Sequence, residues 1–135
     1  MKRIPLQVYN FANSLRPIAH FLLKSKDLDF SIPIIAIVDT GSPITLIGIS
    51  DLKRMRLSNL QLNKLIGKNN EVNIGGGKVV TRILEEANLK FGTDLNINMP
   101  IQFPINSNEN SFQPSLLGVD FMLKSKARLV FDPNK

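Results

Sequence analysis

Asp39 is the side chain of this sequence that is best placed to do chemistry. It follows the apolar run of residues 34–38 and opens the segment Asp39-Thr40-Gly41-Ser42, whose Asp-Thr-Gly triplet occurs once in the chain. A carboxylate that a buried strand delivers into a glycine-containing turn is held rigidly near apolar surface, which makes it a candidate catalytic group. Taken by itself, the triplet is also typical of an ordinary strand-ending turn, because Asp binds its own downstream backbone and Gly tolerates positive φ.

The composition argues against several other kinds of site. The chain has no Cys, which excludes disulfides, thiolate metal ligands and cysteine nucleophiles. The single histidine, His20, cannot build a metal site by itself, and a Ser-His-Asp arrangement would have to recruit it from an alternating strand. Its neighbours two positions away are Ile18 and Leu22, which predicts a structural, partly buried imidazole. We therefore expect no metal and no cofactor.

The chain carries an excess of positive charge, with 17 Lys and Arg against 11 Asp and Glu. The basic residues are scattered, and the densest groups, at residues 53–56 and 124–128, are short and lack interleaved aromatics. We interpret them as solvated helix faces, and binding to nucleic acid remains the less favoured alternative. No run approaches the roughly 20 apolar residues that span a bilayer. We expect a cytoplasmic protein with no membrane partner.

The elements that must position Asp39 are mostly strands. Alternating apolar residues predict strands at residues 4–9 and 17–23, followed by a turn at 24–27. The return arm is residues 30–38, and because residues 34–38 are all apolar we expect it to be covered on both faces. A short strand at residues 44–47 and a helix at 51–56, capped by Ser50, come next. Residues 57–66 fit neither period.

A glycine-rich segment in the middle of the chain predicts a mobile hairpin tip. Its residues are Asn73, Ile74, Gly75, Gly76 and Gly77, and a strand at 78–84 follows. A phosphate cradle is disfavoured, because Val79 stands where Ser or Thr is needed and no helix follows.

The last third of the chain predicts one further hairpin and a strand–helix unit. The hairpin pairs residues 86–91 with 95–103, and a polar loop follows at 106–114. Beyond it we expect a buried strand, a break at Gly118 and a helix that packs Phe121, Met122 and Leu123 inward. The final predicted strand covers residues 127–131.

Three of these features occur in an order that resembles the retropepsin-like family, the single-lobed aspartic proteases of retroviruses, retroelements and some cellular proteins. They are the strand that ends in Asp39-Thr40-Gly41-Ser42, the glycine-rich hairpin tip, and Leu116-Leu117-Gly118 before a short helix. The resemblance covers residues 16–131. It implies a mainly β, single-lobed closed β-barrel with one or two short helices, formed by one domain over residues 1–135.

The resemblance also implies an obligate homodimer and a reaction. Because the chain has one Asp-Thr-Gly, Asp39 must meet its symmetry mate, and the two carboxylates then share one proton and activate water. Thr40 would lock the two turns together, the backbone of Gly41 would orient the carboxylate, and Ser42 would support them. The hairpin tip would fold as a flap over an extended peptide or unfolded protein substrate. Leu116, Leu117 and Gly118 would back the turn or line a substrate pocket.

The sequence departs from the pattern of many viral members at two places. Those members have an acidic residue shortly after Asp-Thr-Gly and a basic residue just after the later Gly, where this chain has Pro43 or Ile44, and Val119. The joint absence of both charges indicates a divergent or cellular-type member. A non-catalytic dimeric module of the same fold, which binds peptides without cutting them, stays as the alternative to an endopeptidase.

Overall fold

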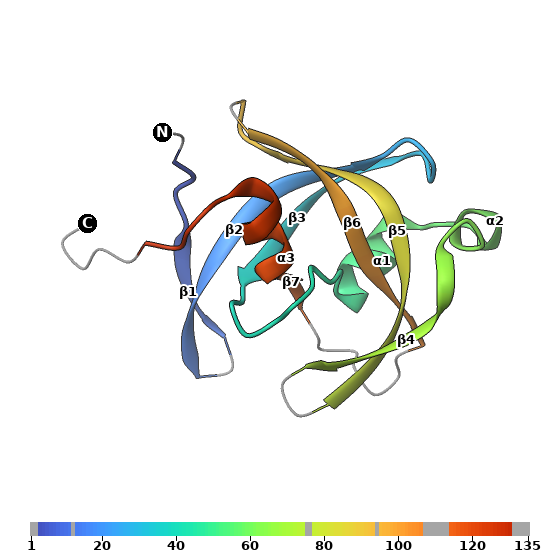
Figure 1. The fold of residues 1–135 in the computed structure, drawn as a ribbon, viewed down its shortest axis with the longest axis horizontal. Helices are drawn as coiled ribbons and strands as arrows, with labels where there is room; N and C mark the ends of the chain where they lie inside the picture. Colours follow the sequence, from blue (N-terminus) through green and yellow to red (C-terminus); the bar gives the residue numbers. More distant parts are fainter. Residues whose placement is uncertain (1–2, 12, 75–76, 94, 107–113, 131–135) are drawn as a thin grey trace.

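The structure is a computed structural model that describes residues 3–11, 13–74, 77–93, 95–106 and 114–130. Within these residues the chain is mainly β, with three short helices (Figure 1). The elements in order are β1 (Gln7–Phe11), β2 (Ser14–Ser25), β3 (Phe30–Val38), α1 (Ile49–Met55), α2 (Asn59–Leu62), β4 (Ile66–Ile74), β5 (Gly77–Phe91), β6 (Leu95–Asn106), β7 (Ser115–Leu117) and α3 (Val119–Ser125). No helix among these residues is both long and apolar enough to cross a membrane.

The strands form one mixed sheet in the order β4-β5-β2-β3-β7, with β1 paired to β2 and β6 paired to β5. The predicted closed barrel is wrong, because among the described strands β6 and β7 do not pair with each other. They are linked through Leu46, which bridges Leu116 on one side and Gln102 on the other. The strand predicted at residues 44–47 is reduced to this one residue, since the backbone N–H of Thr45 donates to a side-chain carboxylate instead of to a strand.

The return arm of the first hairpin is β3, with the predicted bounds, and its burial differs from the prediction. Ile34 and Ala36 face the main core at 1% exposure each. On the other face Ile37 is buried, and Ile35 is 52% exposed. Burial on both faces therefore begins only at residue 36, because the small apolar cluster that covers Ile37 does not extend to Ile35.

The two helices in the middle of the chain begin in different ways. α1 begins at Ile49, two residues before the predicted start, and its N-cap is Gly48 with extended backbone and no side-chain cap, so Ser50 is not the cap. α2 lies in the segment that fits neither period. Ser58 and Gln61 form a reciprocal capping box there, since Gln61 N–H donates to Ser58 Oγ and Ser58 N–H donates to Gln61 Oε1.

The two strands predicted at residues 78–84 and 86–91 are one strand, β5, with an irregularity between Leu84 and Ala87 that shifts its register against β6. An extra residue at such a bulge moves the following side chains to the opposite face from the one that strict alternation would give. The apolar pattern therefore changes within β5, which explains why the sequence suggested a break.

The C-terminal unit is a strand, a glycine and a helix in the predicted order, with two differences. Phe121 is buried in the main core, whereas Leu123 is 75% exposed, so the inward-facing stripe of α3 is narrower than expected. The helix ends at Ser125, and the left-handed backbone of the following Lys126 lets Ala127 N–H donate back to the carbonyl of Met122. Residues 127–130 are not a strand. Residue 131 and the loop tip at 107–113 lie outside the described residues.

Candidate functional site

Asp39 lies at the end of β3, in a turn that its own backbone and side chain hold in place. Its N–H donates to the carbonyl of Leu117 on the parallel neighbour β7 (3.0 Å), and its carbonyl accepts from Ser42 N–H (3.1 Å). The carboxylate Oδ1 accepts a hydrogen bond from Gly41 N–H (2.9 Å). A Cβ at Gly41 would lie 3.2 Å from this oxygen, so a glycine leaves the carboxylate the most room. Asp39 is partly buried, and Thr40 is exposed.

A second segment of chain passes across the turn at Gly118. Val119 N–H donates to the carbonyl of Ser42 (2.8 Å), which ties the start of α3 to the Asp39 turn. A Cβ on Gly118 would lie 2.2 Å from the carbonyl oxygen of Ile44 and 2.8 Å from that of Ser42. The close approach of two backbones is what requires glycine here. The φ of Gly118, −94°, does not require it, because any residue can adopt that angle.

The carboxylate of Asp120 binds the chain that leaves the Asp39 turn. Its Oδ2 accepts from Thr45 N–H (2.9 Å), and its Oδ1 accepts from Thr45 Oγ1 (2.7 Å) and from the N–H of Phe121 (2.7 Å). Thr45 Oγ1 in turn accepts from Gly118 N–H (3.2 Å). Thr45 is 1% exposed, so these bonds are sheltered from water. Asp120 therefore fixes the loop to the first turn of α3.

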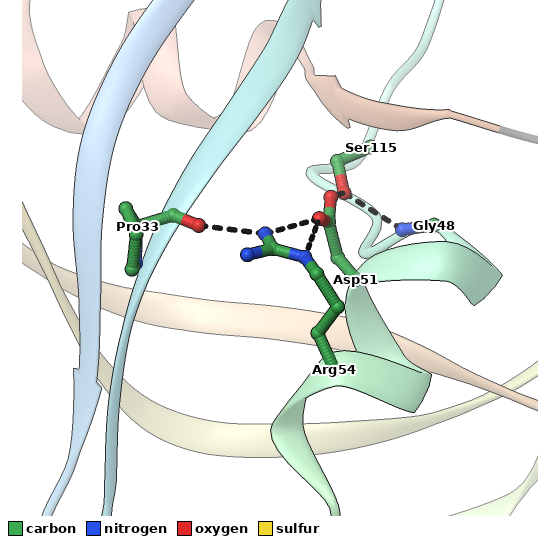
Figure 2. Close-up of polar contacts among 5 residues, drawn as sticks. All are labelled: Pro33, Gly48, Asp51, Arg54 and Ser115. Carbon is green, nitrogen blue, oxygen red and sulfur yellow. Dashed lines mark hydrogen bonds and ion pairs between the residues drawn. The ribbon is translucent and has the colours of Figure 1, made fainter.

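A second polar network connects α1 to both strands that flank the site (Figure 2). Ser115, at the start of β7, accepts from Gly48 N–H (2.8 Å) and donates to Asp51 Oδ2 (2.6 Å). The other carboxylate oxygen of Asp51 pairs with Arg54 (2.6 Å), and Arg54 also donates to the carbonyl of Pro33 on β3 (2.8 Å). Ser115 is 2% exposed, and its hydroxyl is satisfied as donor and acceptor.

The two leucines of the predicted site lie on opposite faces of β7. Leu116 belongs to a small apolar cluster with Ile18, Ile37 and Leu46, against which Ile44 packs. Leu117 belongs to the main core. Both side chains are 3% exposed. Their role in backing the turn or lining a substrate pocket stays a prediction.

The glycine-rich tip is placed only in part. β4 and β5 pair antiparallel from Ile66↔Ile83 to Ile74↔Gly77, with Asn73 opposite Lys78, so the strands of the predicted hairpin are adjacent. Gly75 and Gly76 lie outside the described residues. Closure of this tip over a substrate stays a prediction.

Sequence reasoning missed Thr45, Asp51, Ser115 and Asp120, which bind the site together. Asp120 binds a residue 75 positions away and Ser115 binds one 64 positions away, so no local pattern pairs them. The one local signal was that Asp51 and Asp120 each lie in the first turn of a helix. Among the described residues, no three His, Asp or Glu side chains gather in a way that could hold a metal ion.

His20 differs from its prediction. It is exposed on β2, and its Nε2 lies 3.1 Å from Gln7 Oε1 on β1. The outward direction follows from the strand alternation, because the inner face of β2 carries its neighbours Ala19 and Phe21.

The fold is similar to that of a known protease. The chain matches no protein-family model, and no curated protein is significantly similar to it in sequence. Among the solved structures that match is the EIAV protease in complex with the inhibitor HBY-793, with a TM-score of 0.58 and 19% identity. The alignment covers 91% of this chain and 100% of that one. The chain is therefore mainly β with a retroviral protease-like fold.

Proposed function

We propose that this protein is an aspartic endopeptidase that acts as a homodimer, with Asp39 of each subunit forming the catalytic pair. The observation that carries the proposal is the Asp39 turn itself. The end of β3 presents a partly buried carboxylate, and backbone bonds to Leu117 and across Gly118 tie the turn that carries it to β7 and α3, within a fold similar to that of a protease. The whole chain, residues 1–135, would serve as one domain.

A second copy is needed because Asp-Thr-Gly occurs once in the sequence. Self-association is supported by exposed apolar side chains near both ends of the chain, which an interface would cover. They are Val8, Tyr9 and Leu15 around β1, and Leu129 and Val130 after α3. In Figure 1, β1 and the segment after α3 both lie on the side of the molecule far from α2.

The reaction follows from placing two such carboxylates face to face. Two carboxylates that face each other at close range repel when both are ionised, so the pair favours a state in which it shares one proton. The ionised Asp39 takes a proton from a water molecule, whose oxygen attacks the scissile carbonyl while the protonated Asp39 donates a hydrogen bond to the carbonyl oxygen. The tetrahedral intermediate then collapses as the carboxyl that took the proton from water passes it to the amide nitrogen, whose bond to the carbonyl carbon breaks. No other group has to supply an atom or an electron.

The remaining predicted site residues take supporting roles in this proposal. Thr40, exposed at the turn, would bind its counterpart across the dimer axis. The hairpin tip at residues 73–77 would cover an extended peptide and exclude bulk water. Ser42 is 2% exposed and donates its hydroxyl to the carbonyl of Ile44 (2.7 Å), which stiffens the turn from within.

The test compares the unchanged protein with Asp39→Asn on a degenerate peptide mixture from acidic to neutral pH, with products read by mass spectrometry. We expect cleavage to fall by at least about 10³-fold in the variant, because the carboxylate pair is lost while the dimer persists. The matched control is Asp29→Asn, which changes an exposed turn carboxylate at a positive φ that Asn tolerates.

Cleavage that survives Asp39→Asn would place the chemistry elsewhere. Absence of cleavage in both proteins, with peptide binding retained, would favour the non-catalytic module. Sedimentation at decreasing protein concentration supplies the second criterion, since activity should disappear as the dimer dissociates.

A further inference from the structure

A hollow of about 600 Å³ lies on the outer face of the sheet, formed by β2, β3 and the end of β5, with α1 at one edge. The proposed reaction does not use this hollow. The residues that line it are His20, Phe21, Leu22, Pro33, Ile34, Ile35, Arg54, Lys90 and Gly92.

The strand register puts apolar side chains at the centre of this hollow. Leu22 is opposite Pro33 on β3 and opposite Lys90 on β5, and the next outward-facing row pairs His20 with Ile35. Leu22, Pro33 and Ile35 therefore form a contiguous apolar floor across two strands. Ile35 is 52% exposed, so a ligand that covers it would remove apolar surface from water.

Cationic side chains border this floor on two sides. Lys90 stands beyond Leu22 on β5, and its ammonium group has no hydrogen bond or ion pair within the described part of the chain. Arg54 stands beyond Pro33, where its Nε and Nη2 bind Asp51 and the Pro33 carbonyl (Figure 2). Exposed Lys24 lies in the next row of β2, opposite Ser31. Among the described residues that line the hollow there is no carboxylate.

We propose that this hollow binds an acidic peptide segment that places an aliphatic side chain on Ile35 and Leu22 and its carboxylates beside Lys90 and Arg54. The apolar floor suits an aliphatic side chain and offers nothing to a free phosphate, whereas the border favours negative charge. The formal charge of +6 adds long-range attraction for an acidic partner. β2 and β3 pair with each other along the whole floor of the hollow, so a ligand on this face of the sheet meets side chains. The proposal does not depend on peptidase activity.

The experiment uses fluorescence polarisation with a labelled eight-residue peptide of alternating Glu and Leu, and a Lys and Leu peptide as its charge-reversed partner. Asp39→Asn protein serves as the background, so that cleavage cannot affect the signal. We expect the acidic peptide to bind and the basic one not to. Lys90→Glu and Ile35→Ser should each weaken binding by about 5-fold or more, and added salt should weaken it in the parent protein.

Lys53→Glu is the matched control, because Lys53 is an exposed α1 residue outside the hollow. It carries the same change in net charge as Lys90→Glu and should alter binding by less than about 2-fold. Equal weakening by the two charge reversals, or equal binding of both peptides, would overturn the proposal. The proposal would also be overturned if sedimentation showed that Ile35→Ser changes the oligomeric state, because the face would then form a contact between copies of the chain. Thermal unfolding confirms that each variant is folded.

Discussion

The two faces of β3 rest on very different amounts of apolar packing. The inner face, through Ile34, Ala36 and Val38, joins a core that extends across β2, β5, β6 and α3. The outer face is covered only near Asp39, by the small cluster of Ile18, Ile37, Leu46 and Leu116. The inner packing stabilises the fold as a whole, whereas the outer cluster, together with the hydrogen bonds of Thr45 and Asp120, holds the loop beside the site.

This contrast indicates that the site can loosen locally while the sheet stays folded. A region with few buried apolar contacts opens at a lower free energy than the main core, and specific polar bonds then contribute a larger share of its order. We accordingly expect the loss of stability caused by a substitution around Asp39 to depend on the kind of contact that is changed. The loss should be largest for a close backbone contact, smaller for apolar packing and smallest for a hydrogen bond.

The largest effect is expected for Gly118→Ala. The new Cβ would overlap backbone atoms of Ile44 and Ser42, which cannot move aside as a flexible side chain would, so we expect destabilisation of at least about 4 kcal/mol, or no folded protein. Gly92→Ala is the control, because apart from its chain neighbours no atom of the described residues lies within 4 Å of its added Cβ, and its φ of +59° alone should cost about 1 kcal/mol. Urea unfolding measures both. Equal losses of stability in the two variants would show that the two backbones do not approach closely at Gly118.

The second comparison makes the same change in each cluster. Leu89→Ala, at 0% exposure in the main core, should lower the free energy of unfolding by about 3–4 kcal/mol, and Leu116→Ala in the small cluster by about 2–3 kcal/mol.

Hydrogen exchange distinguishes the two leucine variants beyond their stability. Leu116→Ala should speed exchange of the Asp39 and Leu46 amides more than its global destabilisation explains, because these N–H groups donate to carbonyls of β7. Leu89→Ala should speed their exchange only in proportion to global stability. Equal acceleration at matched stability would mean that both faces of β3 unfold as one unit.

The smallest effect is expected for the carboxylate that holds Thr45. Asp120→Ala leaves a buried N–H and a buried hydroxyl without their acceptor, at a cost of about 2 kcal/mol, whereas Asp120→Asn keeps one acceptor oxygen and should cost about half as much. Glu85→Ala, an exposed carboxylate on β5, is the control and should stay within about 0.5 kcal/mol. Urea unfolding measures all three. Asp120→Ala that costs no more than Glu85→Ala would remove the loop-holding role of Asp120.

Much of the fold could be predicted from local patterns. The bounds of β3, the turn at Asp39, and the order of β7, Gly118 and α3 all follow from apolar runs that end at turn residues, and these signals are carried by neighbouring positions. The capping box at Ser58 and Gln61 was equally local, but it was overlooked because the apolar spacing around it is irregular.

The site's supporting contacts could not be predicted in this way. The reduction of residues 44–47 to a bridge at Leu46 arises because a carboxylate from α3 binds the N–H of Thr45. The exposure of Ile35 reflects how far the small cluster extends over β3, which a uniformly apolar run does not indicate.

By itself, the sequence determined that a carboxylate and a glycine turn end an apolar strand, because alternation and turn chemistry act between residues close in the chain. Only the tertiary structure decided which side chains hold that turn, whether the strands close into a barrel and which part of the outer face stays open. These depend on the path by which segments more than sixty residues apart meet, and bonds such as that between Asp120 and Thr45 exist only once that path is complete.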